Sequence, residues 1–126
     1  MTENKIAGIV FKTAMNLHKK LGPGLLESVY EECLFHDLVK IGLEVKKQKA
    51  LPLIYNEVHL ETGFRVDLMI ENKFIVEIKS VEALNEVHLA QILTYLKLSG
   101  CKLGMLINFN VAYFKNGVRR VISGRL

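Results

Sequence analysis

The chain has 126 residues, of which half are hydrophobic, and carries a formal net charge of +4. This length fits one domain spanning residues 1–126 with a core of its own, and the composition excludes a disordered chain or a disulfide-rich scaffold. The charge is compatible with a nucleic-acid partner but is too small to establish one. No uncharged apolar run approaches the roughly 20 residues of a membrane helix, and the N-terminus lacks the apolar stretch of a signal peptide. We therefore expect no membrane partner, and the two cysteines, Cys33 and Cys101, without a CxxC pattern, are interpreted as reduced core residues of a cytoplasmic protein.

Two amphipathic helices are predicted in the first third of the chain. Apolar residues recur at helical spacing from about Glu3 to Lys20. The sequence "GPG" at residues 22–24 then breaks the chain. Helical spacing resumes from about Leu25 to Lys40, and Gly42 is a natural C-terminal stop.

The middle of the chain changes to the alternating pattern of β-strands. Residues 43–54 are mixed but strand-like, and a turn is expected at residues 55–57. From residue 58 to residue 70, every second side chain is apolar or threonine, which predicts one strand with a single buried face. A second turn at residues 71–73 leads into the strand "FIVEIKS" at residues 74–80.

The last third of the chain predicts one more helix and further strands. Asn85 can cap a helix that reaches about Ser99, with Gly100 just past its end. The Asn116-Gly117 pair is typical of a type I′ hairpin. The strands are expected at residues 103–109, 112–115 and 118–122. The order α-α-β-β-β-α-β-β-β predicts an α/β (α+β) fold with a mixed sheet flanked by helices.

The strand "FIVEIKS" carries two charges within an apolar sequence. Side chains on a strand alternate, so Glu77 and Lys79 share one face. Hairpin partners point to the same side of a sheet, so a three-residue loop at residues 71–73 would place Asp67 opposite Glu77. A two-residue loop would turn Asp67 to the other side, and the pairing of the carboxylates therefore depends on an odd loop length or a bulge.

Two carboxylates that meet across a sheet predict a bound cation. Like charges directly opposite one another are destabilising, and a divalent ion would remove the repulsion. Carboxylate oxygens with open water positions suit Mg²⁺ or Mn²⁺, and such an ion can activate water and stabilise charge on a phosphoryl oxygen. Lys79 could orient that water or neutralise developing negative charge. The alternative is a solvated strand face with alternating charges and no site.

Asp67 followed by Glu77-Ile78-Lys79 resembles the D…(D/E)xK core of the PD-(D/E)xK, or restriction-endonuclease-like, nuclease superfamily. Val66 stands where that motif has its proline. The resemblance implies a restriction-endonuclease-like fold and a metal-dependent nuclease site. In that site Asp67 and Glu77 would hold Mg²⁺ or Mn²⁺ and Lys79 would take part in catalysis.

The stretch "GLLESVY" is similar to the motif of the small bacterial GxxExxY proteins, a branch of the same superfamily. Gly24, Glu27 and Tyr30 stand at the motif's three positions. The likeness covers nearly the whole chain and implies that Glu27 is a further metal ligand or lies next to one, with Tyr30 supporting the site. Taken alone, Glu27 could equally be a carboxylate in the first helical turn that interacts favourably with the helix dipole, and Tyr30 could be an ordinary core aromatic residue.

The predicted third helix carries a polar stripe formed by His88, Gln91 and Tyr95. Gln91 and Tyr95 resemble the QxxxY motif of helicase-associated exonucleases in this superfamily, which implies that they support the substrate or the site. Both residues could also edge a helix–sheet interface, and His88 has the weakest case for a role. The second stripe is apolar and should face the core; it contains Leu89, Ile92, Leu93 and Leu96.

The leading hypothesis is a metal-dependent phosphodiesterase acting on nucleic acid, with DNA favoured over RNA. A second hypothesis is a catalytically inactive nucleic-acid-binding or defence-associated module on the same fold. A third is a structural or oligomerising protein whose carboxylates bind no metal. The strand that follows Gly117 is expected at a sheet edge, where it could pair between two chains of a homodimer.

Overall fold

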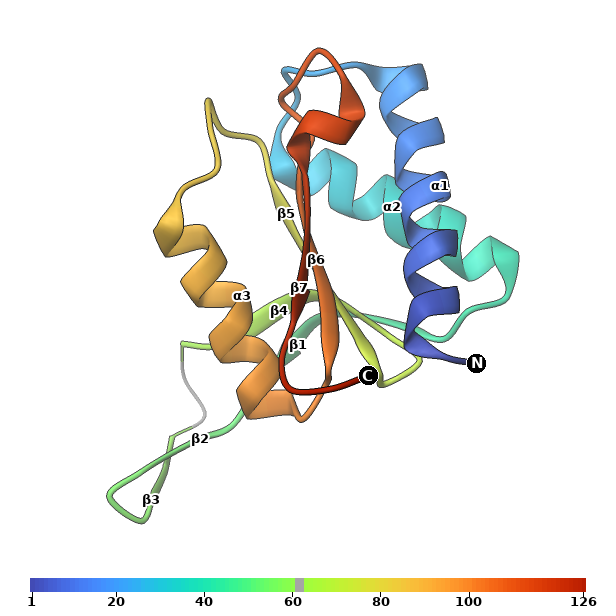
Figure 1. Cartoon of the computed structure of the whole chain (residues 1–126). Coiled ribbons are helices and arrows are strands. Elements are labelled where there is room, and N and C mark those ends of the chain that lie inside the picture. The colour runs from blue at the N-terminus through green and yellow to red at the C-terminus, as the bar shows by residue number, and fades with distance from the viewer. Residues whose placement is uncertain (61–62) are drawn as a thin grey trace.

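A mixed β-sheet with helices on both faces forms the body of the protein (Figure 1). The structure is a computed structural model and describes residues 1–60 and 63–126. The helices are α1 (Glu3–Leu21), α2 (Glu27–Ile41) and α3 (Glu86–Ser99), and the strands are β1 (Val45–Ala50), β2 (Leu53–Tyr55), β3 (Val58–Leu60), β4 (Arg65–Ile70), β5 (Phe74–Lys79), β6 (Leu103–Asn108) and β7 (Val118–Ile122), with a 3₁₀ helix η1 (Phe114–Gly117) before β7. This order confirms the predicted succession of helices, strands, a helix and strands. No helix in the described part of the chain is long and apolar enough to cross a membrane.

The main sheet has five strands in the order β1-β4-β5-β6-β7. Helices α1 and α2 lie on one face, and α3 lies on the other (Figure 1). Strands β5 and β6 are parallel because α3 carries the chain from one to the other, whereas the remaining neighbours are antiparallel. The strand pair on either side of α3 is therefore parallel, as predicted.

Strand β5 runs through the centre of the sheet and separates two layers of the core. Val76 and Ile78 belong to the apolar cluster that packs against α1 and α2. Ile75 belongs to the cluster beneath α3. Glu77 and Lys79 share the face of Ile75 because side chains alternate along a strand, as predicted. The structure adds that this face is the one on which α3 lies.

Helix α3 packs very closely on the sheet, and a glycine makes this approach possible. A Cβ atom added to Gly104 of β6 would lie 3.0 Å from the Ile75 carbonyl oxygen, 3.1 Å from Ile92 Cδ1 and 3.3 Å from Leu96 Cδ2. These separations leave little room for a side chain between the helix and the two central strands. The distance of α3 from β5 therefore depends on the bare backbone at this position.

The buried face of α3 differs in part from the prediction. Ile92 and Leu96 are fully buried as expected, but Tyr95, which was assigned to the polar stripe, is also buried. Leu89, which was expected in the core, is 36% exposed. The predicted cap is confirmed: the Asn85 side chain accepts the His88 N–H, and His88 Nδ1 accepts the Asn85 N–H.

The strands expected at residues 43–54 and 58–70 are each divided. Leu51 and Pro52 separate β1 from β2, since Leu51 is buried and its N–H donates to the Phe64 carbonyl at 2.8 Å, while proline has no N–H to continue a ladder. Strands β2 and β3 form their own two-stranded sheet. Val58 and Leu60, which were expected on a buried face, are exposed because this hairpin projects from the body (Figure 1). Part of the predicted strand, residues 61–62, lies outside the described residues.

The strand expected at residues 112–115 and the hairpin at Asn116-Gly117 were wrong. Residues 111–113 form a bend, and residues 114–117 form η1. A Cβ atom on Gly117 would overlap with the Asn108 carbonyl oxygen. The glycine thus permits close passage of two backbone segments, and the "NG" signal came from this approach instead of from a type I′ turn.

The loop between β4 and β5 has the odd length on which the site depends. Ile70 pairs with Phe74, which leaves residues 71–73 as a three-residue loop. The Lys73 N–H donates to the Ile70 carbonyl at 3.0 Å, and Glu71 and Asn72 both adopt left-handed backbone conformations with φ of 54°. The register assumed from the sequence is therefore confirmed.

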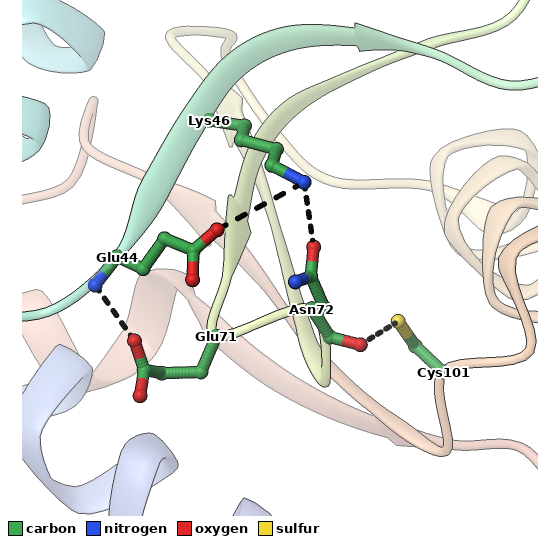
Figure 2. Close-up of polar contacts among 5 residues, drawn as sticks. All are labelled: Glu44, Lys46, Glu71, Asn72 and Cys101. Atoms are coloured by element: carbon green, nitrogen blue, oxygen red, sulfur yellow. Dashed lines mark hydrogen bonds and ion pairs between the residues drawn. The ribbon is translucent and has the colours of Figure 1, made fainter.

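Polar contacts from two other parts of the chain hold this loop (Figure 2). Glu71 Oε2 accepts the backbone N–H of Glu44 at 2.7 Å. Lys46 Nζ donates to Asn72 Oδ1 at 2.9 Å and lies 4.0 Å from Glu44 Oε1. The Cys101 thiol donates to the Asn72 carbonyl at 3.7 Å. These contacts stabilise the left-handed residues and with them the length of the turn.

Candidate active site

Asp67 and Glu77 lie side by side where the ladder between β4 and β5 opens. The paired residues run from Ile70 and Phe74 to Leu68 and Val76. Beyond them the carboxylates take the place of backbone acceptors: Glu77 Oε2 accepts the Asp67 N–H at 2.7 Å. Asp67 Oδ2 in turn accepts the Ile78 N–H at 2.7 Å. The predicted meeting of the two carboxylates is confirmed.

Burial disfavours the charged forms of both carboxylates, and the charge of Asp67 adds to this effect at Glu77. Glu77 is only 3% exposed. Loss of water, followed by the nearby charge of Asp67, raises the pKa of Glu77 from an ordinary 4.5 to about 8. Burial also raises the pKa of Asp67, although the bond from the Ile78 N–H opposes this shift. The pair is therefore poised to take up a proton or a cation.

Lys79 is the cation that acts on both carboxylates, and it lies on the same face of β5 as Glu77. Its charge lowers the pKa of both Asp67 and Glu77, although this effect is weaker than that of burial. The Lys79 ammonium donates to Gln91 Oε1 on α3 at 3.2 Å. The predicted Gln91 is thus brought to the site, where it sets the direction of the lysine side chain.

Tyr95 lies one turn after Gln91, on the same side of α3. It is 4% exposed and contacts the edge of the Phe64 ring, with the two centroids 6.1 Å apart. Burial raises the pKa of Tyr95, and the charges of Glu77 and Asp67 add to this shift. Tyr95 therefore lies close enough to the two carboxylates for their charges to affect its pKa, which agrees with a position beside the candidate site.

Glu27, in the first turn of α2, reaches the chain as it leaves β5. Glu27 Oε2 accepts the Ser80 N–H at 3.1 Å, and the Ser80 hydroxyl donates to the Leu25 carbonyl at 2.6 Å. The Glu27 charge contributes to raising the pKa of Asp67. The start of α2 is thereby fastened beside the carboxylate pair, with Glu27 itself exposed to solvent.

Tyr30 is fully buried and points towards the core between α2 and the sheet. Its hydroxyl donates to the Gly22 carbonyl at 2.6 Å and accepts the Leu25 N–H at 3.1 Å. Its ring stacks on Phe109 with a centroid separation of 4.4 Å. Tyr30 therefore holds the "GPG" loop and acts on the site only through the position of α2.

Two residues at the site were missed from the sequence. The Gln48 amide on β1 donates to Glu31 Oε1 at 2.7 Å and to Asp67 Oδ1 at 3.1 Å. Burial raises the pKa of Glu31, and the charge of Asp67 adds to this shift. Glu31 follows Glu27 by one helical turn, a spacing that could have revealed it. Gln48 gave no such signal, because nothing in the sequence marks its unusual backbone conformation.

A third missed residue, Asn108, fixes the chain after β5. It is 2% exposed and stands beside Lys79 in the parallel register. Asn108 Oδ1 accepts the N–H groups of Val81 and Asn110 at 3.1 and 3.2 Å, and Asn108 Nδ2 donates to the Val81 carbonyl at 2.9 Å. The amide joins the ends of β5 and β6 at the rim of the site.

The donor set fits a hard divalent cation. Asp67 and Glu77 offer carboxylate oxygens whose mutual repulsion a cation would relieve. Within residues 1–60 and 63–126, no group of three or more His, Cys, Asp or Glu side chains is arranged to hold an ion by itself. Two carboxylates with the remaining positions open to water or phosphate match the usual Mg²⁺ site, in which the protein supplies few ligands.

Comparison with known proteins agrees with this geometry. The model of the PD-(D/E)XK nuclease superfamily matches residues 4–121, which span the helices and the sheet except for the first residue of α1 and the last residue of β7. No curated protein and no solved structure gives a significant match. The mixed sheet flanked by helices is consistent with a restriction-endonuclease-like fold, and members of the superfamily generally use divalent metal ions. The chain belongs to the PD-(D/E)XK nuclease superfamily.

Proposed function

We propose that the protein is a Mg²⁺-dependent nuclease, also active with Mn²⁺, that hydrolyses phosphodiester bonds in DNA in preference to RNA. The observation that carries this proposal is the pair of carboxylates formed by buried Glu77 and half-buried Asp67, held together by backbone hydrogen bonds beside Lys79. An arrangement that concentrates negative charge in a buried place is costly for the fold. It is understandable as a binding site for a cation.

Each side chain has a role that follows from its position. Asp67 and Glu77 would hold the metal ion, and Glu27 would reach it directly or through water. A bound divalent ion supplies a lowered water pKa and stabilises charge on a phosphoryl oxygen. Lys79 would orient the attacking water or neutralise charge that develops on the phosphate. Gln91 would keep the Lys79 ammonium in place, and Tyr95, one helical turn further along α3, would support the site.

We also infer that the chain is one of the bacterial GxxExxY proteins within the superfamily. This inference is supported by the contacts around the motif, in which each of the three motif residues has a distinct structural role. Gly24 has a φ of 94°, which favours glycine. Tyr30 holds the loop in which Gly24 lies, and Glu27 joins that loop to Ser80 after β5. The motif thereby attaches α2 to the end of the strand that carries Glu77.

Cleavage of labelled DNA and RNA in Mg²⁺ or Mn²⁺ tests this function. Asp67→Asn and Lys79→Ala are each expected to reduce the rate by about 100-fold or more, the effect of removing one preorganised electrostatic group. Lys97→Ala is the matched control, because Lys97 is an exposed lysine in α3 and is expected to leave the rate unchanged. Equal rates in wild type, Asp67→Asn and Lys79→Ala would exclude the proposed site.

The same assay distinguishes an inactive nucleic-acid-binding module. Such a protein would bind nucleic acid with strong salt dependence and without cleavage in any metal. The homodimer is a separate proposal, supported by the position of β7 at one edge of the sheet. Light scattering of the protein in solution tests it, and a monomeric mass at high protein concentration would exclude it.

A further inference from the structure

Gln48 has an unusual backbone for a residue inside a strand. Its φ is 49°, a left-handed conformation that non-glycine residues rarely adopt. Lys47 and Lys49 pair with Leu68 and Val66 of β4, so Gln48 lies level with Asp67. Residues in such conformations tend to occur at functional sites, where the surrounding structure maintains them.

The left-handed residue redirects a side chain. Neighbouring side chains on a regular strand point to opposite faces. Here Lys47 and Gln48 both contact α2: Lys47 Nζ lies 2.6 Å from Glu32 Oε1, and the Gln48 amide lies 2.7 Å from Glu31 Oε1. The break in alternation thus allows Gln48 to reach α2 while it also contacts Asp67.

The Gln48 amide completes the support of Asp67. Its nitrogen donates to Asp67 Oδ1 at 3.1 Å, while the Ile78 N–H donates to Asp67 Oδ2 at 2.7 Å. Both oxygens of this carboxylate therefore have a fixed donor, one from β1 and one from β5. Glu31 accepts from the same amide nitrogen, and this bond fixes the amide's own direction.

We propose that Gln48 is a positioning residue for metal binding, which orients the Asp67 carboxylate and is itself oriented by Glu31. This role rests on the proposed function of the carboxylate pair. Outer partners of metal-ligating carboxylates act by fixing their orientation, and removing such a partner typically weakens metal affinity by about 10- to 100-fold. Gln48 therefore belongs to the site although it is expected to make no contact with the ion.

Two substitutions at this position separate orientation from backbone strain. Gln48→Gly and Gln48→Ala both remove the amide, but glycine accepts a φ of 49° without strain whereas alanine does not. Mn²⁺ affinity, measured by calorimetry, is expected to fall by about 10- to 100-fold in both variants. The melting temperature is expected to be higher for Gln48→Gly than for Gln48→Ala. If the side chain served stability alone, Mn²⁺ affinity would follow the melting temperature, and Gln48→Gly would bind nearly as wild type does.

Glu32→Ala is the matched control. It removes the ion pair with Lys47, which joins the same helix to the same strand without contacting Asp67. We expect it to leave Mn²⁺ affinity unchanged. An equal loss in Glu32→Ala would mean that docking of α2 on β1 is what matters, and this would overturn the role of Gln48.

Asp67→Asn and a pair of crystal structures complete the test. If wild type binds Mn²⁺ and Asp67→Asn does not, the metal site stands, and normal binding by both Gln48 variants would overturn only the positioning role. If wild type binds no Mn²⁺, both the proposed function and this role are overturned. Crystals of the metal-free wild type and Gln48→Gly should show Asp67 Oδ1 displaced in the variant, and an unmoved carboxylate would also overturn the role.

Discussion

Glu77 accepts a hydrogen bond from the backbone of Asp67, the residue whose charge repels it most strongly. The bond brings the two carboxylates together, and burial removes the water that would screen them. The backbone N–H groups of Asp67 and Ile78 stabilise the charged carboxylates in part, but burial outweighs them and keeps both pKa values raised. Protons or cations are the partners that can relieve the repulsion.

Stability without metal should decrease as pH rises. The folded protein holds a proton on Glu77 up to a pKa of about 8, whereas the unfolded chain releases it near the ordinary 4.5. The folded state therefore binds more protons than the unfolded state between these pH values. The contribution of Glu77 to stability is fully present below pH 4.5 and is lost as the pH rises towards 8. We expect the melting temperature in EDTA to fall between about pH 5 and 8.

Glu77→Gln is the control for this prediction. The amide keeps the size of the side chain and an oxygen for the Asp67 N–H, but it does not titrate. The variant should show a much shallower fall in melting temperature over the same range. Some slope should remain, because the pKa values of Asp67 and Glu31 are also raised. An equally steep fall in the variant would contradict the assignment of the titration to Glu77.

Binding of Mn²⁺ should release a proton below pH 8. The ion binds the charged carboxylate, so it must displace the proton that Glu77 carries when its pKa is about 8. Apparent affinity is expected to rise about tenfold per pH unit below this value and to level off above it. Calorimetry at pH 7 in buffers of different ionisation enthalpy measures the proton count directly, and heats that do not depend on the buffer would contradict the prediction.

Shortening the loop between β4 and β5 should destroy the site while leaving much of the fold. Deleting Asn72 leaves a two-residue turn, which shifts the register by one residue and carries Asp67 to the opposite face. Mn²⁺ binding and cleavage should both be lost. Asn72→Gly keeps the loop length and the left-handed conformation and should retain both activities. Circular dichroism checks that the deletion variant keeps its helices.

Tyr30→Phe should affect stability more than chemistry. The change removes the hydroxyl that bonds Gly22 and Leu25 but keeps the ring that stacks on Phe109. Two hydrogen bonds are lost, and at about 0.5–1.5 kcal/mol each we expect a destabilisation of about 1–3 kcal/mol. The cleavage rate well below the melting temperature should stay within a few-fold of wild type. A large loss of rate with an unchanged melting temperature would show instead that Tyr30 acts at the site.

The sequence predicted the placement of those candidate residues that lie on regular strands and helices. Asp67, Glu77 and Lys79 follow from strand periodicity and one odd loop, and the structure brings the first two together in the expected register. Gln91 and Tyr95 follow from helical spacing, and both come to the same face. These residues could be found because each lies on a regular element with a clear period.

The missed residues depend on departures from regularity. Gln48 reaches the site only through its left-handed backbone, which propensities do not reveal. Asn108 joins segments whose proximity comes from the parallel pairing of β5 and β6. The short strand expected at residues 112–115 was wrong because close packing of Gly117 on Asn108 overrides the local turn signal. Such features arise from tertiary contacts and cannot be deduced from local sequence patterns.

Because Gly104 has no side chain, α3 can lie close to β5, and this sets the distance between Gln91 on the helix and Lys79 on the strand. A methyl group there would press on Ile92 and Leu96 and lift the helix by a few tenths of an ångström. The bond between Lys79 and Gln91 is already 3.2 Å long and has little room to stretch. A residue without a side chain, on the strand next to β5, thus acts as the spacer that keeps the Lys79 ammonium within hydrogen-bonding distance of Gln91.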